Sequence, residues 1–94
     1  MHSIFKLVRT PLFERSAEKL IKKSFSVKEI LDRMLIILEV DPLNLSRVHN
    51  IKKLTDIKKE EGQWRIRIGN YRLRYDISSK DVVLYSFNHR KNAY

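Results

Sequence analysis

The sequence of 94 residues contains no cysteine, which excludes disulfide bonds, thiolate zinc sites and a cysteine nucleophile. Its two glycines, Gly62 and Gly69, are too few for a glycine-rich loop that binds phosphate. The longest apolar run, Met34–Leu38, is far shorter than the roughly 18 residues of a membrane span. The three histidines are scattered, so we expect no metal ion, no other cofactor and no membrane contact.

Acidic residues are also scarce, with 11 Asp and Glu against 20 Lys and Arg and a formal net charge of +9. The excess lies mostly in residues 42–94, and it points to a polyanionic partner such as nucleic acid or an acidic protein. The N-terminal residues lack the apolar stretch of a secretory signal, and a cysteine-free chain suits a reducing compartment, so we expect a cytoplasmic protein. No repeat or linker divides the chain, so we expect a single domain over residues 1–94.

The first half of the sequence predicts a short strand followed by two helices. Residues 4–8 have the apolar character of a strand, and Thr10 is the expected N-cap of a helix that begins at Pro11 and ends near residue 24. The segment Ser26–Glu29 matches a capping box for a second helix, which should end at Asp41 because the next residue is a proline. Apolar residues at helical spacing and the short connection predict an antiparallel helical hairpin with a buried stripe.

The second half predicts an antiparallel sheet. Residues 48–54 read as a short strand, and residues 63–77 alternate apolar and polar around Gly69-Asn70, which is a signal for a two-residue hairpin turn. Because side chains alternate between the faces of a strand, one face of this hairpin carries the apolar side chains and the other carries Arg65, Arg67, Arg72 and Arg74. The apolar segment 82–87 should be an interior strand of the same sheet. We therefore expect the α+β class: an N-terminal strand and a helical hairpin packed on one face of a small, mostly antiparallel sheet.

The four arginines are costly for stability. The expected register places Arg65 opposite Arg74 and Arg67 opposite Arg72, and like charges directly opposite each other destabilise a sheet. Any mixture of polar residues would serve an open sheet face as well. Forked guanidinium groups suit phosphate, so we interpret the cluster as an anion-binding surface.

The last expected strand is followed by Asn88-His89-Arg90-Lys91-Asn92-Ala93-Tyr94. Together with the pattern Gly-Asn-Tyr-Arg-Leu-Arg-Tyr from residue 69, this segment resembles the RelE/ParE superfamily of toxins of type II toxin–antitoxin systems, and in particular its RelE-like branch of mRNA interferases. The resemblance spans nearly the whole chain. It implies a RelE-like fold and a ribosome-dependent endoribonuclease that cleaves mRNA in the A site and is neutralised by a cognate antitoxin protein. The implied reaction is attack of a ribose 2′-OH on the adjacent phosphodiester, without a metal ion.

The resemblance also assigns roles to individual residues. The expected catalytic residues are Arg65, Arg67, Arg72, His89, Arg90 and Tyr94, and the expected RNA-binding residues are Arg65, Arg67, Arg72, Arg74 and Lys91. Some RelE toxins have lysine at the two positions that Arg65 and Arg67 occupy. Arginine binds phosphate but stays protonated, so it is a poor general base. His89 is a candidate for proton transfer, and Glu60 and Glu61 are further candidates that a solvated loop would also explain.

Two other functions fit the same fold and charge. ParE-like proteins of the sister branch inhibit DNA gyrase and cleave no RNA, and they generally lack the clustered arginine and tyrosine site. A non-catalytic basic module that binds RNA or the ribosome would also explain the net charge. The arginine cluster and Tyr94 favour the endoribonuclease over both.

Overall fold

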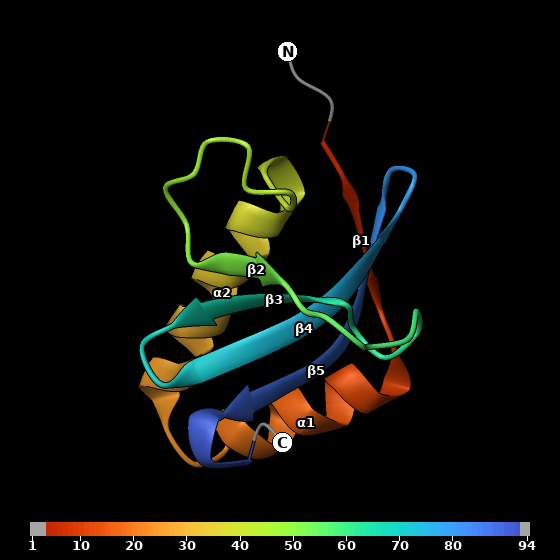
Figure 1. The fold of residues 1–94 in the computed structure, drawn as a ribbon. Coiled ribbons are helices and arrows are strands. Elements are labelled where there is room, and N and C mark those ends of the chain that lie inside the picture. The colour runs from red at the N-terminus through yellow and green to blue at the C-terminus, as the bar shows by residue number, and fades with distance from the viewer. Residues whose placement is uncertain (1–3, 93–94) are drawn as a thin grey trace.

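The computed structural model describes residues 4–92 and contains one sheet with helices packed on it (Figure 1). In chain order the elements are β1 (Lys6–Arg9), α1 (Pro11–Ile21), α2 (Phe25–Val40), β2 (Ile51–Lys53), β3 (Trp64–Ile68), β4 (Tyr71–Ser78), β5 (Asp81–His89) and the 3₁₀ helix η1 (Arg90–Asn92). The strand order is β1-β5-β4-β3-β2, with β1 parallel to β5 and all other pairs antiparallel. This confirms the expected α+β class, and none of the helices in residues 4–92 is long and apolar enough to cross a membrane.

Helix α1 begins where the sequence predicts. The Thr10 hydroxyl accepts a hydrogen bond from the backbone N–H of Phe13 at 3.1 Å, and Pro11 occupies the first turn. The same hydroxyl donates to the carbonyl of Leu84 at 2.7 Å. One side chain therefore both caps α1 and ties its start to β5.

Helix α2 does not use the predicted capping box. Its N-cap is Ser24, the first helical residue is Phe25, and no side chain caps the backbone there. Ser26 lies inside the first turn, where its hydroxyl meets that of Ser24 at 2.9 Å. The connection after α1 is only three residues long, so the second helix starts before the predicted box. The predicted end at Asp41 is confirmed.

Strand β2 is shorter than predicted because the residues before it form a loop held by side chains. Asn44 pairs with the backbone of His49 through its amide nitrogen (2.9 Å) and its amide oxygen (3.1 Å). Asp41 accepts hydrogen bonds from the N–H of Leu45 and the hydroxyl of Ser46. Residues 41–50 are therefore closed on themselves, and only Ile51–Lys53 joins the sheet.

The core lies between the helices and one face of the sheet. The hairpin and β5 contribute Ile66, Leu73, Tyr75, Leu84 and Phe87, all fully buried. They pack against apolar side chains of both helices, namely Phe13, Ala17, Val27, Leu31, Met34 and Leu38. The buried Tyr75 hydroxyl donates to the carbonyl of Pro42 at 2.8 Å, so the core contains no unsatisfied hydroxyl there. The opposite face of the hairpin is left open.

Gly62, which precedes β3, offers a test of how tightly this loop is packed on the sheet. It has φ +83°, and an added Cβ would lie 2.8 Å from the Cβ of Arg74. We expect Gly62→Ala to lower the free energy of unfolding by about 2 kcal/mol, since it combines backbone strain with a steric clash. Urea denaturation measures the change.

Gly69→Ala is the matched control, because Gly69 also has a positive φ (+59°) but an added Cβ meets nothing within 4 Å. Its cost should stay near 1 kcal/mol, from backbone strain alone. Equal losses in the free energy of unfolding for the two variants would show that the loop carrying Gly62 moves to accommodate the added methyl group.

Candidate nucleic-acid interface

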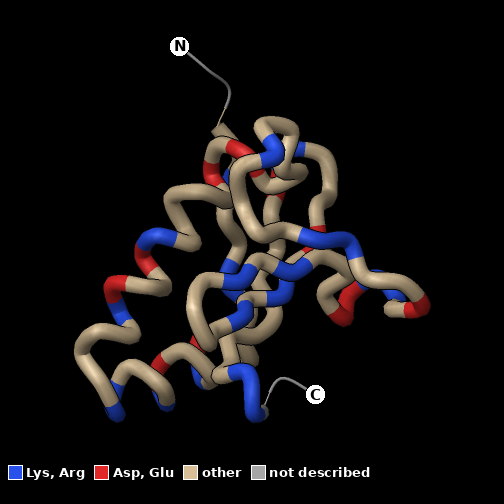
Figure 2. The backbone as a smooth tube through the Cα atoms, turned by 60° about the vertical axis from the view of Figure 1, so that its left-hand side comes forward, with Lys and Arg blue, Asp and Glu red and all other residues tan. Residues whose placement is uncertain are grey.

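The four arginines of the hairpin form one surface, as the sequence predicts. Arg65 lies opposite Arg74 and Arg67 opposite Arg72 in the β3–β4 register. These side chains point away from the core, because their neighbours along each strand are the buried apolar residues. We call this surface the arginine face: Arg65, Arg67, Arg72 and Arg74. Figure 2 shows the basic positions of neighbouring strands side by side in the middle of the molecule.

Neutral oxygen atoms hold three of these guanidinium groups in place. Arg65 donates to the side-chain oxygen of Asn50 at 2.7 Å. Arg67 donates through Nε to the carbonyl of Gly69, and Arg74 donates through Nε to the carbonyl of Gly62, each at 3.1 Å. These hydrogen bonds orient the arginines without neutralising them. A surface that is ordered and still positively charged is suited to a phosphate group.

The residues next to this surface extend it on both sides. Lys52 of β2 lies opposite Arg65, and on β5 Asn88 lies opposite Arg72. Arg90, the first residue of η1, donates its backbone N–H to the carbonyl of Asn70 at 2.7 Å. This contact brings Arg90 beside the hairpin turn, close to the end of the arginine face. Lys91 follows it and is exposed.

His89 lies on the other side of the sheet from the arginine face. It is opposite Tyr71 in the β4–β5 register, and the two rings meet edge to face with centroids 5.2 Å apart. Tyr71 packs against the core, and His89 lines a cavity with residues of α1. The structure therefore places the backbone of Arg90 beside the hairpin turn, whereas the ring of His89 lies across the sheet from the arginine face. Tyr94, the last expected site residue, lies outside the described residues.

Asp76 and Tyr85 border the arginine face, and the sequence analysis did not single them out. The Asp76 carboxylate is only 3% exposed and accepts the backbone N–H groups of Glu60 (2.5 Å) and Gln63 (2.6 Å). It thereby fixes the loop that leads into β3. Tyr85 is the extra residue of an irregularity in β5, next to Ser86, which lies opposite Arg74.

The environment of Tyr85 keeps its hydroxyl protonated. Partial burial raises the pKa of Tyr85, and the negative charges of Asp76 and Glu60 raise this pKa further. An aromatic ring beside guanidinium groups can stack on a nucleobase. No local sequence signal marks this position, because the irregularity that creates it depends on the pairing of β5 with β4. Within residues 4–92, no three His, Asp or Glu side chains come together as a metal site.

Comparison with known proteins identifies the family. The profile of the ParE toxin of type II toxin–antitoxin systems (parDE) matches residues 7–94. The chain belongs to this family. The expected place in the RelE/ParE superfamily is thus confirmed. Among solved structures, the RelBE2 toxin–antitoxin complex from Mycobacterium tuberculosis is similar, with a TM-score of 0.69 and 24% identity over 93% of this chain and 99% of that chain. This similarity confirms the RelE-like fold. No curated protein matches the sequence.

The register of the toxin's hairpin predicts that function and stability conflict at Arg67. We expect Arg67→Glu to raise the free energy of unfolding by about 0.5–1 kcal/mol, since a carboxylate opposite Arg72 replaces a repulsive pair with an attractive one. Urea denaturation at low salt measures the gain, which should shrink in high salt because the charges are screened.

Arg33→Glu on the exposed side of α2 changes the net charge equally and is the control. A gain as large in this variant would mean that the reduction in net charge, rather than the cross-strand repulsion, sets the stability.

Proposed function

We propose that this toxin is an endoribonuclease that cleaves mRNA in the A site of the ribosome. The observation that carries the proposal is the arginine face, with two pairs of opposed arginines on an open side of the sheet. Repulsion between them lowers stability, so a function that needs the charge is the reason to retain it. Guanidinium groups bind phosphate oxygens through two parallel hydrogen bonds, and the RNA backbone supplies such groups.

In the proposed reaction a ribose 2′-OH attacks the adjacent phosphorus atom, and the bond from phosphorus to the 5′ oxygen breaks. The products are a 2′,3′-cyclic phosphate and a 5′-OH, with the proton of the 2′-OH passing to the leaving oxygen overall. Negative charge builds up on the phosphate oxygens in the transition state. Arg65, Arg67 and Arg72 would stabilise that charge, and Arg90 would add to it from the end of the hairpin.

The proposed roles of the other site residues follow from their positions. Arginine stays protonated in proteins, so none of these arginines can remove the proton of the 2′-OH. His89 faces the other side of the sheet, and its Nδ1 accepts the backbone N–H of Lys91 at 3.2 Å. This contact supports a positioning role for His89, in the segment that carries Arg90 and leads to Tyr94. Arg74 and Lys91 would bind RNA, Tyr94 would stack on a base or orient the nucleophile, and catalysis would depend chiefly on orientation and charge stabilisation.

We also propose a cognate antitoxin as the protein partner. The similar RelBE2 structure is a complex of a toxin with its antitoxin. An acidic or amphipathic segment that covers the arginine face would block access of RNA to it. Such binding should weaken as the ionic strength rises, because the charges involved lie at the surface.

A second candidate is inhibition of DNA gyrase without RNA cleavage. It is favoured by the family match, which is to the ParE toxin over residues 7–94. The arginine face would then bind the protein or DNA of the gyrase complex, and no chemistry would occur on it.

An in vitro translation reaction with a defined mRNA tests the proposal. We expect primer extension to reveal new 5′ ends only when ribosomes translate the message. Arg72→Ala should reduce these cuts about 100-fold or more, since it removes a group that stabilises the transition state. Arg33→Ala, which removes an exposed arginine of α2, should cut like the unaltered protein.

Circular dichroism of Arg72→Ala checks that the variant is folded. If the protein also cleaves RNA when no ribosomes are present, it is an endoribonuclease that does not require the ribosome. Loss of gyrase supercoiling with no cuts in any reaction would replace the proposal by the gyrase candidate.

A further inference from the structure

A second basic site lies on the helix side of the sheet, away from the arginine face. A cavity of about 380 Å³ opens between α1 and the end of β5. Its lining residues are Leu12, Arg15, Ser16, Lys19, Leu20, Lys23, Asn88 and His89. The lining contains three full positive charges and no carboxylate. We call it the α1 cavity.

The basic residues of this cavity form a stripe that costs helix stability. Arg15 and Lys19 are four residues apart along α1, and Lys23 continues the spacing just beyond the helix, so like charges are neighbours. None of the three forms an ion pair with any residue in the described range 4–92. The helix dipole favours cations near the C-terminal end, but it does not explain Arg15, which lies in the middle of α1.

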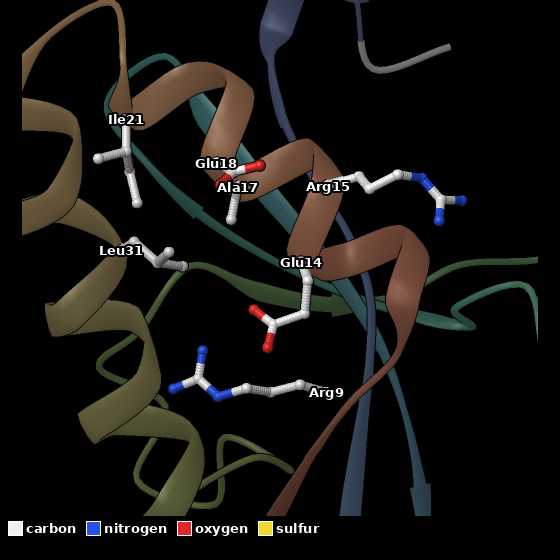
Figure 3. A pocket seen from close by; sticks show the side chains of 7 residues that line it. All are labelled: Arg9, Glu14, Arg15, Ala17, Glu18, Ile21 and Leu31. Carbon is white, nitrogen blue, oxygen red and sulfur yellow. The ribbon is translucent and has the colours of Figure 1, made fainter.

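The acidic residues of α1 face a different cavity. Glu14 and Glu18 line a space between α1 and α2 together with Arg9 of β1 and Arg15, so Arg15 lines both cavities. In the close view of that cavity, Glu14 points toward Arg9 while Arg15 points away from both (Figure 3). Lys19 and Lys23 therefore line the α1 cavity alone, Glu14 and Glu18 line the other cavity alone, and Arg15 lies between the two.

The polar groups at the base of the α1 cavity have a defined arrangement. The Ser16 hydroxyl accepts the backbone N–H of Phe87 and donates to the carbonyl of Phe13, each at 3.0 Å, so its one proton is already engaged within the fold. Because Nδ1 of His89 accepts a hydrogen bond from Lys91, the proton of its neutral ring is on Nε2. Nε2 is then a donor, as are the lysine and arginine groups around it. The charged side chains of the cavity and the imidazole of His89 thus all present hydrogen-bond donors, which is what an anion requires.

We propose that the α1 cavity is a second anion-binding site, which binds a phosphate group of an RNA backbone. The inference rests on the proposed function, since it gives the same RNA a second contact. Asn88 connects the two surfaces: it lies opposite Arg72 in the sheet and also lines the cavity. Arg90 and Lys91 follow directly. A polyanionic chain that rounds the end of β5 would meet cations on both faces, and lysine binds phosphate as a point charge.

Fluorescence anisotropy with a short single-stranded RNA tests this site, with every 2′-OH methylated so that the RNA is not cleaved. The variant is Lys19→Ala/Lys23→Ala. We expect it to bind the RNA about tenfold more weakly at low salt. The plot of log K against log salt should become less steep by about 1.4, which corresponds to the loss of two phosphate contacts at roughly 0.7 each.

The matched control is Lys6→Ala/Lys22→Ala, which removes two exposed lysines that do not line the cavity and lowers the net charge equally. Lys22 also caps the C-terminal end of α1, so this control accounts for the dipole effect. Circular dichroism confirms folding of both. Equal affinity and slope in the two double variants would overturn the proposed cavity site.

Arg72→Ala in the same titration separates this inference from the proposed function. If it weakens RNA binding while the Lys19/Lys23 variant matches its control, the arginine face stands and the α1 cavity does not. If only the Lys19/Lys23 variant loses affinity, the cavity binds RNA and the proposed site of cleavage is wrong. If that variant binds RNA normally but loses binding to a poly-glutamate peptide, the cavity binds an acidic protein instead, which also overturns the proposal.

Discussion

The pairing of β3 with β4 in a single register is the constraint on which the rest of this toxin depends. With Ile66 opposite Leu73, every apolar side chain of the hairpin enters the core and every arginine leaves it. A shift of one residue would reverse both faces at once, so that guanidinium groups would be buried among the helices. The free energy gained by burying Ile66, Leu73 and Tyr75 therefore also holds the arginines together against their repulsion.

Hydrogen bonds between segments that are far apart in the sequence offset the repulsion between the arginines. Thr10 and Ser16 of the first helical region bond to the backbone of β5, and Tyr75 bonds to the carbonyl of Pro42 beyond α2. Asp76 holds the loop before β3 by two short hydrogen bonds to backbone N–H groups. Because these polar side chains satisfy backbone groups that would otherwise be buried without partners, they fix the sheet edge and the loop while the charged surface stays open.

Local sequence rules predicted the hairpin and the start of the first helix, but α1 ends at Ile21, before the expected residue 24. They also failed where tertiary contacts compete. Alternation around Gly69-Asn70 gave the observed register, and Thr10-Pro11 marked the start of α1. The capping box at Ser26 was wrong because the short connection starts α2 earlier, at Phe25. The strand expected over residues 48–54 was too long because side-chain hydrogen bonds close the loop before it.

The amino-acid sequence by itself determined that four arginines share one side of a hairpin, because side chains alternate between faces along any strand. It also determined the basic charge and the family, which its residues 7–94 match. Only the tertiary structure decided that His89 lies across the sheet from those arginines and that Asn88 lies beside Arg72. It alone brought Arg15 and Lys19 next to the end of β5, about seventy residues later in the chain. These positions depend on strand order and helix packing, which no local pattern of residues encodes.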